Sequence, residues 1–174
     1  MSDFFEKVTS QQDPLKQLLS YIPGFKGYVE RQNRRDADKL IRDTVARRFE
    51  EQWKRVSNLQ ADLVNSRKIE YVDDMEKAAI KLRTFIDKIS TAPRGYSGMF
   101  DAVKINEAEL LALYQFDLAF FELAKQIGSA VDNVEATLND ETGLPAAINN
   151  LTTLARNAVD IYNRRSEAVT GNGN

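Results

Sequence analysis

The side chains that could do chemistry in this chain are carboxylates, hydroxyls, amines and guanidiniums, because its 174 residues include no histidine and no cysteine. Those two residue types supply the commonest general base, the commonest thiol nucleophile and the preferred ligands of zinc. The di-iron centres of helical bundles also need Glu-x-x-His pairs, which this chain cannot form. We therefore predict no catalytic residue, no cofactor site and no metal site, and the sequence favours a protein that is not an enzyme.

Two short motifs carry groups of reactive type. The acidic cluster at residues 73–76 lies at the start of a predicted helix, where carboxylates stabilise the helix dipole, so we interpret it as a solvated cap. Residues 95–98 (Gly-Tyr-Ser-Gly) lack the G-x-S-x-G spacing and any histidine to activate the serine. We expect the loop around them to cover the end of the core, or to serve as a binding loop through Tyr96 and Phe100.

Asp117 is the one carboxylate that the helical pattern places among apolar side chains. At 100° per residue it lies on the side of its helix opposite the narrow polar stripe. A buried carboxylate is costly unless it is paired or protonated. We therefore predict a buried polar pair in which Asp117 accepts a hydrogen bond from Arg48, Tyr114 or another buried donor. The pair would fix the helix register, or Asp117 would act as a perturbed acid or ligand contact.

The elements that must position these residues are long helices. Apolar residues recur at three- and four-residue steps, which predicts an all-α fold: an up-and-down four-helix bundle with one or two short N-terminal helices. The expected single domain covers residues 1–170, with a disordered tail at 171–174. Within it, we expect an N-terminal amphipathic segment at 1–24 and long helices at 28–66, 70–91, 107–139 and 145–168. The steps in 70–91 are also typical of a coiled-coil seam.

The unequal lengths of the first two long helices leave an overhang. At about 1.5 Å per residue, the helix at 28–66 is much longer than its neighbour at 70–91, so about residues 28–46 extend past it. The apolar side chains there need a cover. The N-terminal helices, the loop at 92–105 or a second copy of the chain could supply it.

The charge pattern suggests where a partner could bind. Residues 26–55 carry a net positive charge and residues 106–141 a net negative one, although the whole chain is close to neutral at −2. We expect these segments to pair with each other or to meet a charged partner. Nucleic acid is not expected, because no aromatic residues lie in the basic face to stack bases. The expected contacts with a partner or a membrane are Phe4, Phe5, Val8, Arg31, Arg34, Arg35, Tyr96 and Phe100.

Two stretches carry a resemblance. Residues 22–38 (IPGFKGYVERQNRRDAD) and 95–104 (GYSGMFDAVK) resemble a family of small, uncharacterised bacterial all-helical proteins. The similarity extends over about residues 22–125. It implies a bacterial, cytoplasmic setting and carries over no catalytic residue.

The leading prediction is a non-enzymatic helical-bundle adaptor or scaffold that acts through protein–protein contacts or self-association. One alternative is a peripheral membrane-associated stress or scaffold component that binds anionic lipid. The other is a small-ligand binder or enzyme that uses the buried Asp117. The N-terminus lacks the apolar core of a secretory signal, no apolar run is long enough to span a bilayer, and the absence of cysteine fits the cytoplasm.

Overall fold

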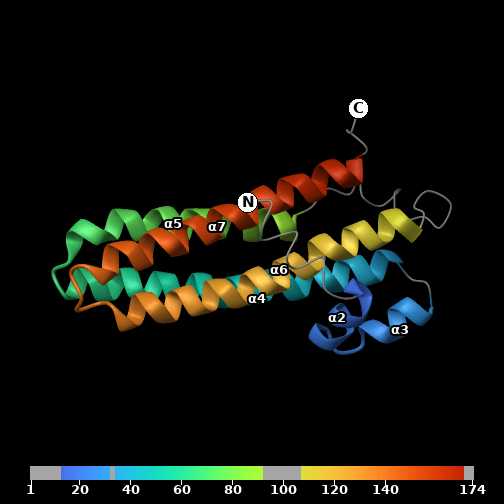
Figure 1. The fold of residues 1–174 in the computed structure, drawn as a ribbon, viewed down its shortest axis with the longest axis horizontal. Coiled ribbons are helices and arrows are strands. Elements are labelled where there is room, and N and C mark those ends of the chain that lie inside the picture. The colour runs from blue at the N-terminus through green and yellow to red at the C-terminus, as the bar shows by residue number, and fades with distance from the viewer. Residues whose placement is uncertain (1–12, 32–33, 92–106, 171–174) are drawn as a thin grey trace.

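The chain folds into helices that run along a common long axis (Figure 1). The computed structural model describes residues 13–31, 34–91 and 107–170. Its elements are α2 (Pro14–Tyr21), α3 (Phe25–Glu30), α4 (Arg34–Asn65), the short 3-10 helix η1 (Ile69–Tyr71), α5 (Val72–Ser90), α6 (Glu107–Ala136) and α7 (Gly143–Thr170). The described part of the chain is thus all-helical, as its periodicity predicts.

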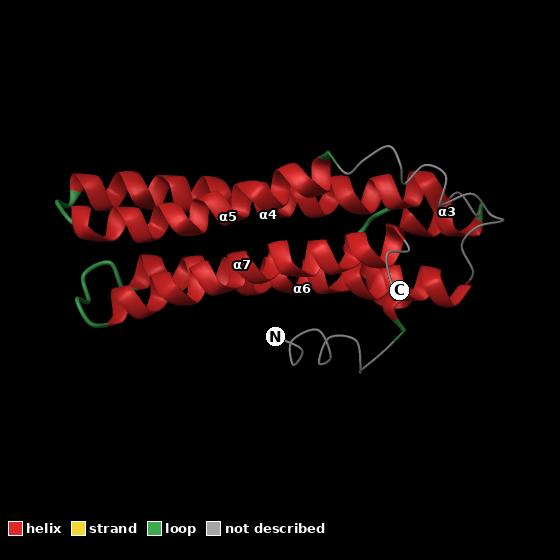
Figure 2. Ribbon diagram, turned by 90° about the horizontal axis from the view of Figure 1, so that it is seen from above, coloured by secondary structure: helices red, strands yellow, loops and turns green. Residues whose placement is uncertain are grey.

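The four long helices lie in two layers (Figure 2), with α4 and α5 in one and α6 and α7 in the other. Each layer is an antiparallel hairpin closed by a short connection. Across the layers, α5 lies beside α7 and α4 lies beside α6. Because α4 and α6 run in the same direction, as do α5 and α7, each of these two helix pairs between the layers is parallel (Figure 1). We refer to α4–α7 as the helical body.

Aromatic side chains fill the centre of the helical body. Phe85 of α5 is fully buried, and its ring centroid lies 4.2 Å from Phe49 of α4, 5.1 Å from Phe120 of α6 and 6.4 Å from Tyr162 of α7. One ring therefore contacts all three of the other long helices. Burial of this kind contributes most of the stability of a helical protein, because isolated helices are marginal in water.

The N-terminal part of the chain differs from the expectation of one helix over 28–66. α2 begins as predicted at Asp13-Pro14, where Asp13 accepts a hydrogen bond from the backbone N–H of Leu15 at 3.1 Å. Two separate helices, α3 and α4, then replace the continuous one. α3 packs against α4, and Phe25 at its start is completely buried, with its ring edge-on to Tyr114 of α6. Burial of this ring stabilises the position of α3 against the long helices.

The predicted overhang exists and is covered. α5 ends at Ser90, at the level of Arg42, whose Nη1 donates to the carbonyl oxygen of Ile89 at 3.4 Å. α4 continues past this point, as do α6 and α7 (Figure 1). α2 contacts α6 and α3 contacts α4 there. The N-terminal helices therefore cover this end of the helical body, and we call it the extended end.

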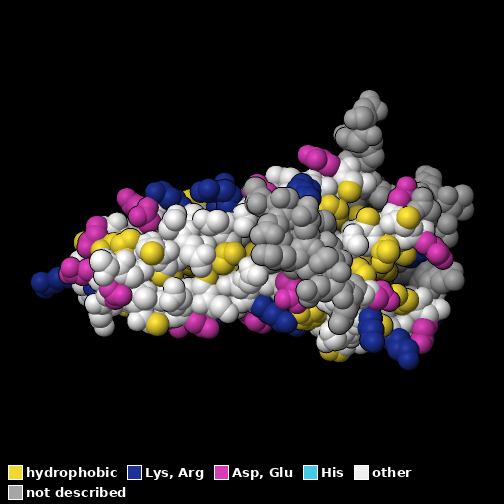
Figure 3. Space-filling view, viewed as in Figure 1, with side chains coloured by type: hydrophobic (Ala, Val, Ile, Leu, Met, Phe, Trp, Pro, Cys, Tyr) yellow, Lys and Arg dark blue, Asp and Glu magenta, His cyan; other side chains and the backbone are white. Residues whose placement is uncertain are grey.

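The surface mixes both signs of charge. Figure 3 shows basic and acidic side chains interspersed over one face, with short apolar stretches between them. Among the described helices, none combines the length and the apolar character needed to cross a bilayer. The predicted tail at 171–174 and the predicted loop at 92–105 lie outside the described residues.

Candidate functional site

A buried cluster of charges joins three long helices at the extended end. Arg165 of α7 donates from Nε to Oδ1 of Asp117 on α6 at 2.8 Å, and from Nη2 to Oδ1 of Asp38 on α4, also at 2.8 Å. Arg165 and Asp117 are each 1% exposed and Asp38 is 6% exposed. We call these three residues the charge triad. Each helix contributes one member, so the triad fixes the three helices at one register.

A fourth residue links the triad to α5. Arg42 of α4 donates from Nε to Oδ2 of Asp38 at 2.8 Å, and it is the residue that reaches the end of α5 through the Ile89 carbonyl oxygen. Its side chain is 17% exposed, so it lies at the edge of the cluster. No buried side-chain nitrogen or oxygen of the described residues lacks a hydrogen-bond partner. The buried charges are thus matched by hydrogen bonds within the fold, as burial requires.

The surroundings of Asp117 perturb its ionisation. Burial raises the pKa of Asp117 to about 6, and the negative charge of Asp38 adds to the rise, while Arg165 and Arg42 oppose it. Burial would lower the pKa of Arg165, but the charges of Asp117 and Asp38 outweigh it and raise that pKa. Burial, followed by the charge of Asp117, raises the pKa of Tyr114 to about 12. Arg165 therefore stays charged, whereas Asp117 changes its protonation state near pH 6.

Asp117 accepts from a buried donor, as predicted, but that donor is Arg165 and neither of the two named candidates. Arg48 of α4 lies at the level of Phe121, one helical turn past Asp117, with its guanidinium carbon 5.3 Å from the ring centroid of Phe121 and 5.6 Å from that of Tyr21. Arg48 therefore makes cation–π contacts with one ring of α2, that of Tyr21, and one ring of α6, that of Phe121. Tyr114 lies near Asp117, but its ring packs edge-on against Phe25 at 6.0 Å. The burial of Asp117 is as expected.

The sequence contained a signal for the two missed members. Arg165 comes three residues after Tyr162 and continues the apolar stripe of α7, while Asp38 lies three residues before Ile41 on the stripe of α4. A charged residue that continues an apolar stripe is expected to be buried and paired. Asp38 also pairs with Arg42, four residues further along α4, and both side chains lie largely inside the fold.

A second group of contacts fastens α2 to the helical body. The ring of Tyr21 stacks on Phe121 at 5.0 Å, and Lys125 donates to the Tyr21 hydroxyl at 2.6 Å. That hydroxyl also donates to Glu122. Burial, followed by the hydrogen bond to Glu122, raises the pKa of Tyr21. The end of α2 is thus fixed by aromatic packing, and its hydroxyl is shared between an acid and a base of α6.

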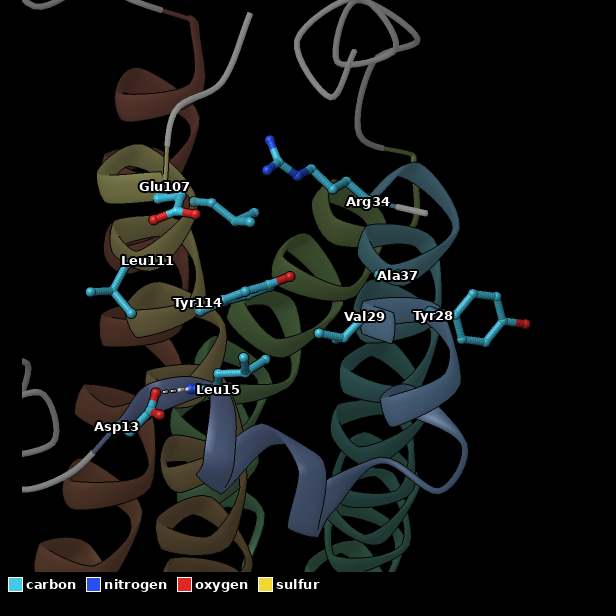
Figure 4. Close-up of a pocket in the computed structure, with 10 residues that line it drawn as sticks. Asp13, Leu15, Tyr28, Val29, Arg34, Ala37, Glu107, Leu111 and Tyr114 are labelled. Carbon is cyan, nitrogen blue, oxygen red and sulfur yellow. Dashed lines mark hydrogen bonds between the residues drawn. The ribbon is translucent and has the colours of Figure 1, made fainter. Parts of the chain in front are cut away.

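An apolar cavity of about 270 Å³ opens beside these helices (Figure 4). Leu15 of α2, Val29 of α3 and Tyr114 of α6 point toward the space between the helices, whereas Tyr28 and Leu111 point outward (Figure 4). The lining residues are Asp13, Leu15, Tyr28, Val29, Arg34, Ala37, Glu107, Leu110, Leu111 and Tyr114. We call this the end cavity. It combines an apolar interior with charged residues of both signs.

Three of the predicted partner contacts lie at this end. Arg34 lines the end cavity, Arg31 lies over the ring of Tyr28 at 5.4 Å, and Arg35 is the exposed neighbour of Arg34. Of the three, Arg34 is the one that lines the cavity itself. The other five, Phe4, Phe5, Val8, Tyr96 and Phe100, lie outside the described residues.

The triad and the end cavity differ in what they could bind. Asp117, Asp38 and Arg165 are not among the residues that line the end cavity. Among the described residues, no group of three or more potential metal ligands comes together. Comparisons of the chain with protein-family models, curated proteins and solved structures found no match. The resemblance to a bacterial helical family stays a prediction, and the geometry of the two sites carries the argument about function.

Proposed function

We propose that this chain is a non-enzymatic adaptor or scaffold, built as an up-and-down four-helix bundle, that binds a segment of a partner protein at the end cavity. The observation that carries this proposal is an apolar cavity at the extended end whose lining includes the predicted contact residue Arg34. The charge triad serves that site by holding α4, α6 and α7 in register beneath it.

The size and lining of the cavity favour an inserted side chain. Pockets that enclose whole small molecules usually measure about 300–1,000 Å³, and this one falls just below that range. Leu111, 43% exposed, extends its apolar lining onto the surface of α6. Helices that dock in grooves place apolar anchors of this kind against such surfaces. An amphipathic segment with one large apolar residue therefore fits the cavity.

The charges around the cavity specify the partner further. Arg31, Arg34 and Arg35 lie on the α3 and α4 side, whereas Asp13 and Glu107 lie on the α2 and α6 side. A partner segment with an acidic residue next to its apolar anchor would meet the arginines on one side. Such complementarity contributes orientation and association rate more than affinity. The bound partner would thus be an acidic, amphipathic protein segment.

The test places a photo-reactive amino acid at Leu111 in cells that make the protein. The matched control carries the same group at Val64, which is 50% exposed and lies near the opposite end of α4. We expect an adduct with a specific protein at Leu111 and not at Val64, and mass spectrometry should map it to an acidic amphipathic segment. Equal adducts from both positions would contradict the proposed site.

A charge-reversal variant separates specific binding from proximity. Arg31→Glu combined with Arg35→Glu alters two exposed side chains and leaves the cavity lining intact. We expect the adduct at Leu111 to weaken severalfold, because the partner segment then meets like charge. An adduct that is indifferent to this reversal would refute the acidic partner. If the unsubstituted protein bound anionic vesicles and this double variant did not, the membrane alternative would be favoured over a protein partner.

A further inference from the structure

The charge triad contains more negative than positive charge in its most buried part. Asp38 and Asp117 share the single cation of Arg165, and all three are at most 6% exposed. Arg42 supplies a second cation, but it lies at the edge of the cluster, where solvent screens part of its charge. The innermost three groups therefore carry a net charge of −1 in apolar surroundings, and the more exposed Arg42 is the cation that balances it. A single bound proton would neutralise the three groups by themselves.

The hydrogen bonds indicate which oxygen would hold that proton. Both oxygens of Asp38 are engaged at 2.8 Å, Oδ1 by Arg165 and Oδ2 by Arg42. Oδ1 of Asp117 is engaged in the same way, but its Oδ2 has only a 3.5 Å contact with Nη2 of Arg165. Of the four carboxylate oxygens, Oδ2 of Asp117 accepts the weakest hydrogen bond. Protonation at this oxygen therefore weakens the existing hydrogen bonds least.

We propose that the triad is a proton-binding site, in which the folded protein takes up one proton at Oδ2 of Asp117 between neutral and mildly acidic pH. The bound proton holds α4, α6 and α7 together more firmly. This proposal does not depend on the proposed adaptor function. It assigns to the extended end a response to pH that is separate from the binding of a partner.

The groups that face Asp117 from the packed helices support this assignment. α4 presents Asp38, which favours the proton, and Arg42, which opposes it; α7 presents Arg165, which also opposes it. On α6 itself, Tyr114 stays neutral because burial raises its pKa. From α5 the carbonyl oxygen of Ile89 joins the network by accepting a hydrogen bond from Arg42. Burial is the largest influence and favours the proton, so the pKa of Asp117 rises to about 6.

The direction of the stability change follows from linkage. The pKa of Asp117 is higher in the folded chain than its unperturbed value of 3.8, so the folded chain binds the proton more tightly than the unfolded chain does. The protein therefore becomes more stable as pH falls from neutral toward about 5. From a pKa of about 6, the equilibrium constant for unfolding should fall about tenfold between pH 7 and pH 5. The direction is opposite to ordinary acid denaturation.

The composition of the chain leaves few other groups that titrate between pH 5 and pH 7. It contains no histidine, the residue that normally dominates titration between pH 5 and 8. Unperturbed carboxylates complete their titration below about pH 5. A pH dependence of stability between pH 5 and pH 7 therefore reports on perturbed acids, and among the described residues Asp117 is the buried carboxyl group whose pKa lies in this range.

The test follows the carboxyl carbons of the full-length protein by ¹³C NMR during a pH titration, with Asp117→Asn to assign the signal. We expect a midpoint near 6 for Asp117. Asp38→Asn should lower the midpoint because it removes a repelling charge, and Arg42→Gln should raise it because it removes an attracting one. Asp132→Asn, which changes an exposed acid paired with Arg55, should leave it unchanged.

Several results would overturn the proposal. A midpoint at or below about 4 would show that Asp117 stays ionised, as an ordinary aspartate does. A midpoint that does not move in Asp38→Asn would show that the two acids are not coupled. If Asp117→Asn fails to fold, Arg42→Gln provides the same test, because Arg42 lies at the edge of the cluster. An unfolding constant that rises or stays constant between pH 7 and pH 5 would also refute the assignment.

Discussion

Replacing Arg165 with methionine should be among the most damaging single changes in this protein. The substitution removes two hydrogen bonds of 2.8 Å and leaves Asp117 and Asp38 without their shared cation. Removing one partner of a buried ion pair typically costs about 3–5 kcal/mol. We expect about 3 kcal/mol at pH 7, at the lower end of that range, because Asp38 keeps Arg42 and Asp117 can take up a proton. Lower pH should reduce the loss further.

The assay is urea denaturation followed by circular dichroism, in which a change of midpoint at constant slope reports stability. The matched control is Arg164→Met on the same helix, since Arg164 is exposed and lies over the ring of Phe116 at 5.9 Å. Its loss should cost less than about 1 kcal/mol. If Arg165→Met cost no more than this control, the triad would not stabilise the fold as we argue. A triple change of Asp38→Asn, Asp117→Asn and Arg165→Met should recover part of the loss, because it removes both stranded charges.

Three other substitutions, one of them with a control, test the packing, the backbone and the ionisation of the fold. Phe85→Ala should cost about 3–5 kcal/mol in urea denaturation, because its ring contacts three other helices, whereas Ile80→Ala, at 52% exposure, should cost less than about 0.5 kcal/mol. Gly24→Ala should cost about 1 kcal/mol in the same assay, since Gly24 has a φ of 83°, and no steric clash would add to this, because nothing lies within 4 Å of an added Cβ. Stability should fall between about pH 10 and pH 12 as the unfolded chain ionises at Tyr114 before the folded chain does; Tyr114→Phe should fall less over that range, and an identical fall would contradict the burial of the hydroxyl.

The helical pattern predicts most of the fold because it depends on local spacing. The steps of apolar residues in α5 and the Asp13-Pro14 start of α2 both appear in the structure close to their expected positions. The break between α3 and α4 could not be predicted, since no glycine or proline lies between Gly27 and Pro93. It depends on where Phe25 packs, which is a property of the tertiary structure.

The candidate site was predicted only in part for a similar reason. The position of Asp117 on its own helix implies burial, and burial implies a partner. Which side chain faces it depends on the relative shift of α4, α6 and α7, and a shift of one turn separates Arg48 from the correct level. Arg165 could have been found by extending the apolar stripe of α7 by one more step past Tyr162. Its partner Asp38 would still have required knowledge of the packing.

The arrangement of the triad also has a consequence for the order of folding. Asp38 belongs to the hairpin of α4 and α5, whereas Asp117 and Arg165 belong to the hairpin of α6 and α7, and 127 residues separate Asp38 from Arg165. Each hairpin can form from contacts close in sequence, which are generally made quickly. The triad can form only once the two hairpins have met and the charges have lost their water. Its bonds should therefore be largely absent from the transition state, so that weakening them accelerates unfolding and leaves the folding rate nearly unchanged. The same three side chains would then determine how long the assembled protein persists, and not how fast it assembles.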